Sequence, residues 1–150
     1  TLDNDSIVSG QSIEIPGTGI EMVPPHYFKV SDQFPGFIHT GSASTITVTR
    51  ETGTPFFMFG MKKVQQNFES QGVDFIEQKE VKTRDGKKAM LYVLGFVVED
   101  MEFRRLIMVT GDLNNTILIN ANYPLVAKDL LHNELMNSLL SVKINSLNLE

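Results

Sequence analysis

The chain has 150 residues, of which 41% are hydrophobic and 21% are charged, and its formal net charge is −5. This length suits one domain that buries about two-thirds of its unfolded surface, and the apolar fraction excludes wholesale disorder. A pI near 5.2 argues against general binding of nucleic acid or anionic membranes, for which clustered Lys and Arg supply most of the affinity. The absence of cysteine excludes disulfides, thiol nucleophiles and thiolate metal sites, and no apolar run approaches the ~20 residues of a membrane-spanning helix.

The N-terminal part is predicted to consist of a polar arm followed by short strands. Residues 1–11 are polar and lack periodicity, so we expect a flexible arm in front of a single domain over residues 12–150. Turn residues such as Pro16-Gly17 and Pro24-Pro25 separate the apolar segments that follow. The expected strands are residues 12–15, 20–23, 27–30, 36–40 and 44–50, of which the last is β-branched and alternating.

A first helix is predicted over residues 55–71. Thr54 is a suitable N-cap, Pro55 suits the first helical position, and Gly72 suits a left-handed C-cap. A helix that covers a sheet needs only an apolar stripe, but the first turn here is apolar on all sides, through Phe56, Phe57, Met58 and Phe59. The simpler interpretation is that this turn is buried under the preceding strands. The alternative is an exposed aromatic patch that binds a partner or an apolar ligand.

An antiparallel meander is predicted after this helix. Asp85-Gly86 is a strong signal for a hairpin turn between two apolar segments. The strand after the turn is apolar at both odd and even positions, which predicts a central strand covered on both faces. The expected strands of the meander are residues 73–83, 88–98, 102–110 and 116–123.

A second helix is predicted over residues 124–140, with a proline at its first position. Its apolar stripe recurs every four residues, at Leu131, Leu135 and Leu139. The tail over residues 142–149 is expected to add an edge strand. The chain order predicts an α+β sandwich in which helices cover an antiparallel sheet. This order is small strands, a helix, a long meander and a second helix.

Two histidines form a candidate metal site. If the first hairpin is centred on Asp32-Gln33, His26 and His39 lie opposite each other on one face, with Cβ atoms about 5 Å apart. Two such imidazoles can share a zinc or copper ion, with Glu21 or water completing the coordination. A register shift of one residue would separate them, and surface histidines are more often solvated than ligands. His132, on the second helix, is expected to be solvated.

Catalytic motifs are not evident in the sequence. Glu99, Asp100 and Glu102 form an acidic hairpin tip, where carboxylates are expected to be solvated rather than to act as a catalytic acid and base. No G-x-S-x-G nucleophile elbow occurs, and Gly17-Thr18-Gly19 lacks the third glycine of a phosphate-binding loop. We therefore expect a protein that is not an enzyme and that uses no cofactor.

Short structural motifs occur along most of the chain. They are residues 21–28 (EMVPPHYF), 34–37 (FPGF), 87–89 (KKA) and 136–141 (MNSLLS). Together these motifs, spread over about residues 12–145, resemble the opening, the long strand and the final helix of the PsbP/Mog-like superfamily. The resemblance is greatest to its bacterial branch of exported, often lipid-anchored proteins similar to DcrB.

The resemblance implies a three-layer α/β/α sandwich around a central antiparallel β-sheet. It implies no catalytic residues, because the family shares no active-site motif, and its members of known role act as assembly factors, adaptors or chaperones. We expect a non-enzymatic protein of the bacterial cell envelope or periplasm that binds an unidentified protein partner. Residues 1–11 would then be a spacer after a removed signal peptide or an upstream lipid anchor.

Two other functions stay open. A cytosolic chaperone or adaptor would shield an apolar helix of a client protein, with Phe56–Phe59 and the methionines of the first helix as its groove. A weak metal-binding protein would use His26 and His39.

Overall fold

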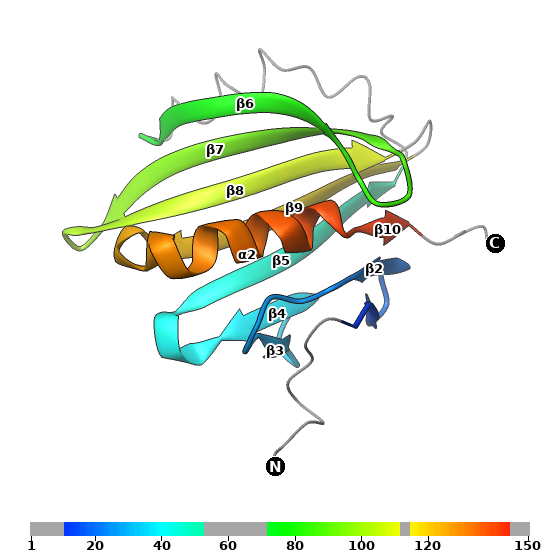
Figure 1. Cartoon of the computed structure of the whole chain (residues 1–150), viewed down its shortest axis with the longest axis horizontal. Coiled ribbons are helices and arrows are strands. Elements are labelled where there is room, and N and C mark those ends of the chain that lie inside the picture. The colour runs from blue at the N-terminus through cyan, green and yellow to red at the C-terminus, as the bar shows by residue number, and fades with distance from the viewer. Residues whose placement is uncertain (1–10, 53–71, 112–114, 145–150) are drawn as a thin grey trace.

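A computed structural model describes residues 11–52, 72–111 and 115–144, and these form a long antiparallel sheet with one α-helix packed against it (Figure 1). The strands are β1 (Ile13–Ile15), β2 (Ile20–Met22), β3 (Lys29–Val30), β4 (Gly36–His39), β5 (Ser44–Thr52), β6 (Asp74–Lys82), β7 (Lys88–Val98), β8 (Met101–Gly111), β9 (Asn115–Pro124) and β10 (Lys143–Ile144). The helical elements are the 3-10 turns η1 (Thr40–Ser42) and η3 (Leu125–Ala127) and the α-helix α2 (Lys128–Leu140). The helix predicted over 55–71 and nearly all of the predicted arm lie outside the described residues.

In the described part of the chain, the long sheet has seven strands in the order β3-β4-β5-β9-β8-β7-β6, and each neighbouring pair is antiparallel. The predicted meander is confirmed, because β6 to β9 begin and end within one residue of the expected positions. Asp85-Gly86 lies in the turn between β6 and β7, and Gly86 has a φ of 82°. A smaller sheet has the order β1-β2-β10, so the edge strand expected in the C-terminal tail is confirmed.

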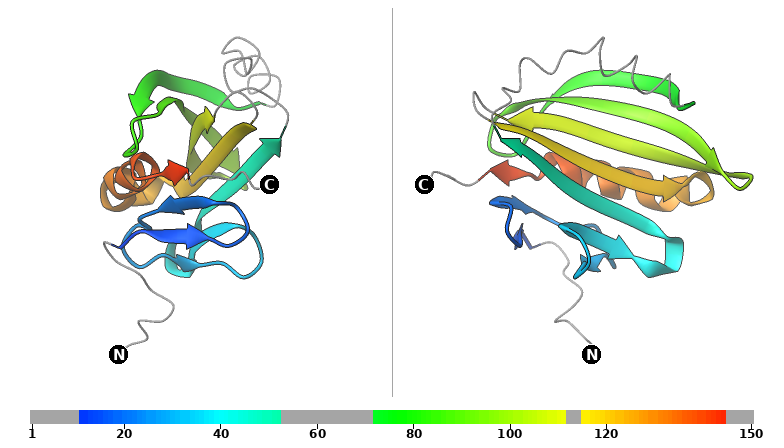
Figure 2. Two further views of the ribbon diagram at one scale, coloured as in Figure 1. Left: turned by 90° about the vertical axis from the view of Figure 1, so that its right-hand side faces the viewer. Right: turned by 180° about the vertical axis from the view of Figure 1, so that it is seen from behind.

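One face of the long sheet is buried against α2, which lies across it (Figure 2). The predicted leucine stripe is confirmed, since Leu131, Leu135 and Leu139 are at most 4% exposed. They belong to the same buried cluster as Leu91 of β7 and Leu106 of β8. Burial of each such side chain contributes about 1.5–3 kcal/mol, so this contact holds the helix on the sheet.

The opposite face is also buried along the middle of β7 and β8. Tyr92, Leu94, Ile107 and Val109 form a second cluster in which no side chain is more than 3% exposed. The prediction that the strand over residues 88–98 is covered on both faces is therefore confirmed for its middle. β7 is also an interior strand, since it pairs with β6 on one side and with β8 on the other, and β6 forms the edge of the sheet.

The first hairpin has a different register from the one expected. Val30 pairs with Phe37, which centres the hairpin on Gln33-Phe34, one residue later than predicted. Ser31 stabilises this loop by donating its N–H to the carbonyl of Gly36 at 3.0 Å. Loop length and internal hydrogen bonds therefore decide the register, and the sequence alternation alone could not.

The α-helix begins later than the sequence predicts. Pro124 ends β9 opposite Phe103 with extended backbone (φ −71°, ψ 140°), and η3 connects it to Lys128, where α2 begins. The fixed φ and missing N–H of proline suit a strand end as well as the first turn of a helix, which explains the error.

The described residues thus form an α+β fold that is rich in sheet and mostly antiparallel. They do not show the expected three-layer α/β/α sandwich, because their one α-helix covers one face and the predicted first helix lies outside them. No helix within the described ranges is long and apolar enough to cross a membrane.

Candidate functional site

The turn from β7 to β8 lies at the same end of the sheet as the start of α2 (Figure 1). Exposed apolar side chains gather at this end of the sheet. Eight large hydrophobic side chains are exposed in the described part of the chain, and five of them lie at this end of the sheet. We call these five the tip surface: Val97, Val98, Met101, Val126 and Leu130. Val126 is 90% exposed and Leu130 is 70% exposed. Val97 and Val98 are consecutive on β7 and point to opposite faces of the hairpin, so the exposed apolar side chains lie on both sides of this end of the domain. A concentration of exposed apolar side chains at one end of a folded domain is typical of an interaction site.

The tip surface is exposed because the β7–β8 hairpin extends beyond both neighbouring strands. Pairing of β6 with β7 stops at Gly95, and pairing of β8 with β9 stops at Phe103. The β7–β8 ladder continues to the pair of Val98 and Met101. The last residues of this hairpin therefore have no strand beside them to bury their side chains.

The turn at the end of the hairpin is acidic and strained. Glu99 and Asp100 are the two residues between Val98 and Met101, and their φ angles are 50° and 71°. Two-residue turns with positive φ at both positions favour Asn-Gly, and a side chain in this region costs about 1–2 kcal/mol. Glu102 follows directly, so residues 97–102 carry three carboxylates and no basic side chain. We call Glu99, Asp100 and Glu102 the tip carboxylates.

A shallow pocket of about 420 Å³ is lined by the tip carboxylates and by two of the five residues of the tip surface. Its other lining residues are Met101, Leu125 and Val126. No salt bridge within the described ranges involves the tip carboxylates, since the two that occur join Lys79 to Glu77 and Lys88 to Glu80. The pocket therefore combines an apolar lining with negative charge that no salt bridge in these ranges neutralises.

The two arginines behind the tip have other partners. The guanidinium of Arg105 lies 4.7 Å from the ring centroid of Phe96 and donates to Oδ1 of Asn122 at 2.8 Å. Arg104 donates to the carbonyl of Phe103 at 3.4 Å and lies so close above Gly95 that a Cβ there would be 2.9 Å from Nη1. Both side chains thus help to hold the base of the hairpin.

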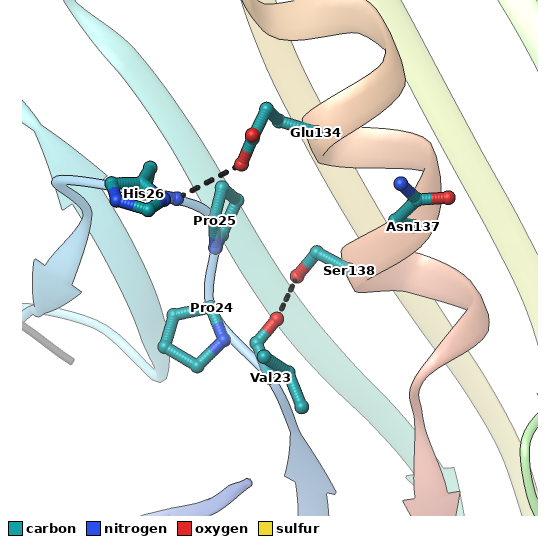
Figure 3. A pocket seen from close by; sticks show the side chains of 7 residues that line it. All are labelled: Val23, Pro24, Pro25, His26, Glu134, Asn137 and Ser138. Carbon is teal, nitrogen blue, oxygen red and sulfur yellow. Dashed lines mark hydrogen bonds between the residues drawn. The ribbon is translucent and has the colours of Figure 1, made fainter. Parts of the chain in front are cut away.

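A second pocket, of about 260 Å³, lies between α2 and the segment that follows β2 (Figure 3). The N–H of His26 donates to Oε1 of Glu134 at 3.1 Å, and Oγ of Ser138 donates to the carbonyl of Val23 at 2.6 Å. Pro24 and Pro25 between them are buried and have no N–H to satisfy. These contacts explain the pocket as the junction between the N-terminal segment and α2.

The two histidines of the predicted metal site have different neighbours. His26 is exposed and lines the pocket beside α2, whereas His39 stacks on Phe28 at 5.3 Å and its Nδ1 lies 2.6 Å from Oγ of Ser42. The register that was expected to place them opposite each other is wrong, because the hairpin pairs Lys29 with Ile38 and Val30 with Phe37. Among the described residues, no group of three or more His, Cys, Asp or Glu could hold a metal ion. The shared metal ion stays a prediction.

A partly buried pair joins α2 to the sheet near the tip. The hydroxyl of Tyr123 and Nδ1 of His132 are 2.6 Å apart, and their rings meet edge to face. Burial lowers the pKa of His132, and the positive charge of Lys128 lowers it further. Burial raises the pKa of Tyr123, although the positive charge of Arg104 opposes this rise. His132 is therefore not the solvated helix residue expected from the sequence, since it contacts a fully buried tyrosine.

Comparison with known proteins reveals similarity of structure. No model of a known protein family matches the sequence, and no curated protein matches it significantly. The solution structure of cyanobacterial PsbP (CyanoP) from Synechocystis superposes with a TM-score of 0.61 at 18% identity, covering 96% of this chain and 97% of that one. The chain has a PsbP-like fold. This confirms the PsbP-like fold that the short motifs of the sequence predict, whereas the likeness to DcrB-like exported proteins stays a prediction.

Two further structures share the PsbP-like fold. LpqN, involved in cell envelope biogenesis of Mycobacterium tuberculosis, gives a TM-score of 0.59 at 13% identity, covering 95% of this chain and 94% of that one. A crystal structure from Bacteroides thetaiotaomicron gives 0.61 at 13% identity, covering 95% of this chain but 51% of that one. At these identities the similarity shows the fold alone.

The sequence predicts a binding patch at Phe56–Phe59 and not at the tip surface of this PsbP-like domain. That segment lies outside the described residues and stays a prediction. One signal for the tip was present, because Val97 and Val98 are both apolar directly before an acidic turn. Which neighbouring strands stop short of that turn was not readable from the sequence.

The strained turn generates the first prediction. Replacing Glu99 by Asn and Asp100 by Gly should raise the free energy of unfolding by about 1 kcal/mol or more, because Asn-Gly adopts positive φ at lower cost. Urea denaturation measures the change. The charge control is Glu99→Gln with Asp100 retained, which should give no comparable gain. Equal effects of the two variants would contradict the strained geometry.

The Tyr123–His132 pair generates a prediction for pH. The unfolded chain binds a proton on His132 near pH 6.5, and the folded chain does so only at lower pH, because burial lowers the folded pKa. The free energy of unfolding should therefore fall as the pH drops below about 6.5 and level off below the folded pKa. Urea titrations across this range should show a smaller fall for His132→Gln than for the wild type; identical falls would refute the assignment.

Proposed function

We propose that this chain is a non-enzymatic protein of the bacterial cell envelope that binds another protein through the tip surface. The observation that carries the proposal is the gathering of five exposed apolar side chains on the projecting β7–β8 hairpin and the adjoining start of α2. Exposed apolar groups beside polar ones are typical of protein interaction sites. Enzyme sites more often line a concave pocket with convergent polar groups.

The envelope location rests on the structural neighbours. LpqN is described as involved in cell envelope biogenesis, and it shares the fold over nearly its whole length. In this proposal the polar segment over residues 1–11 is the spacer that follows a removed signal peptide or an upstream lipid anchor. The arm leads into Ser12, whose hydroxyl accepts a hydrogen bond from Arg84 in the β6–β7 turn at 3.1 Å. That turn is at the opposite end of β7 from the tip, so a tether there would leave the tip surface accessible.

Localisation and binding can be tested together in bacteria that carry the complete gene. The protein should fractionate with the envelope, and a photo-activatable amino acid in place of Val126 should cross-link to another protein. Tyr27 is the matched control, since it is 65% exposed but lies outside the tip surface. A cytosolic protein, or equal cross-linking from both positions, would count against the proposal.

The three-layer sandwich is a further part of the proposal. The cluster around Tyr92 and Ile107 is buried on the face that α2 does not cover. We propose that residues 55–71 form the predicted helix and supply the third layer on that face.

A proline substitution tests this layer. Val64→Pro should lower the free energy of unfolding by about 3 kcal/mol relative to Val64→Ala, because proline inside a helix removes a hydrogen bond and clashes with the preceding turn. Chemical denaturation of both variants measures the difference. Similar stabilities of the proline and alanine variants would show that residue 64 is not inside a helix.

A further inference from the structure

We propose that the tip surface binds a cationic amphipathic segment of another protein, with a Lys or Arg side chain in the pocket between η3 and the β7–β8 turn. This inference rests on the proposed function, because it names the partner chemistry of the same surface. It follows from the way in which apolar side chains and carboxylates are combined at the tip.

The pocket suits a side chain that is apolar along its length and positive at its end. Met101, Leu125 and Val126 supply apolar lining, and the tip carboxylates lie on the same pocket. Lys and Arg have aliphatic stems that pack on apolar surface while the charged end stays at the polar rim. Apolar residues elsewhere in the segment would cover Val97 and Leu130, which are 61% and 70% exposed.

The charge of the tip selects against other occupants. Residues 97–102 carry three acidic side chains and no basic one, so the tip would be repelled by the anionic headgroups of a membrane. A basic protein segment meets both requirements, since it offers apolar contact and opposite charge. Complementary charge contributes mainly to the choice of partner and the rate of encounter, and apolar burial contributes the affinity.

A second copy of this chain fits less well. The β6–β7 turn at the opposite end of β7 is basic, with Lys82, Arg84, Lys87 and Lys88 close together. None of the large hydrophobic side chains exposed in the described ranges lies on that turn. Contact between the tip of one copy and the β6–β7 turn of another would therefore pair opposite charges but leave the tip surface uncovered. Such head-to-tail contacts would also link the copies into an open chain of molecules.

The test uses the folded domain and a synthetic amphipathic peptide of Leu and Lys. A peptide of Leu and Glu with the same sequence pattern serves as the probe of opposite charge. Fluorescence anisotropy should show binding of the Leu/Lys peptide only. Combined Glu99→Gln, Asp100→Asn and Glu102→Gln should weaken that binding about tenfold, as expected for loss of three exposed charge contacts. Val126→Ser should weaken it as well, because it removes apolar contact.

The matched control changes the net charge equally at exposed positions away from the tip, by Glu14→Gln, Asp32→Asn and Glu80→Gln. This triple variant should bind the Leu/Lys peptide as the wild type does. Equal weakening by the two triple variants would show a general charge effect and overturn the inference. Binding to phosphatidylglycerol vesicles that depends on Val126 would overturn the inference in favour of a lipid. Self-association in sedimentation that the tip substitutions abolish would overturn it in favour of a second copy of this chain.

The outcomes also separate this inference from the proposed function. Cross-linking from position 126 can be measured with the tip carboxylates neutralised. If it is unchanged, the proposed function is supported and the inference of a cationic partner is overturned. Binding of the Leu/Lys peptide that depends on the tip, in a protein found in the cytosol, would support the partner chemistry and count against the envelope location.

Discussion

Packing of the α2 leucines against the long sheet is the constraint on which the rest of the structure depends. Leu131, Leu135 and Leu139 bury one face of the sheet, and the same cluster includes residues of the small N-terminal strands, such as Ile20 and Met22. The helix thereby joins the meander to the N-terminal part of the chain. Ser138 of α2 donates a hydrogen bond to the carbonyl of Val23, and Glu134 of α2 accepts one from the N–H of His26, which satisfies polar groups at this junction that would be costly to leave unpaired.

The candidate site is a consequence of where this packing ends. The β7–β8 ladder continues past the last pairs made by β6 and β9, so its final residues extend beyond the buried part of the sheet. Val97 and Val98 are exposed there, although Val93 and Leu94 on the same strand are buried. The difference between core and site along β7 is therefore a difference in neighbours, because the side chains are of similar type.

The sequence was most informative where a pattern is local. Alternation and the Asp85-Gly86 turn located the four meander strands to within one residue, and the leucine spacing identified the buried face of α2. It was least informative where two structures use the same residue. Pro124 fits a strand end and a helix start equally well, and the first hairpin had two plausible centres that differ by one residue.

The amino-acid sequence by itself determined the α+β class, the order of the described meander strands and α2, and the PsbP-like resemblance, because periodicity and turn chemistry act over a few neighbouring residues. Only the tertiary structure decided which apolar residues stay exposed, since exposure depends on strands and helices that are distant in sequence. It separated His26 from His39 through one register, and it paired His132 with Tyr123. It also revealed the tip surface, because the ends of four different strands must be compared in space before β7 and β8 are seen to extend beyond β6 and β9.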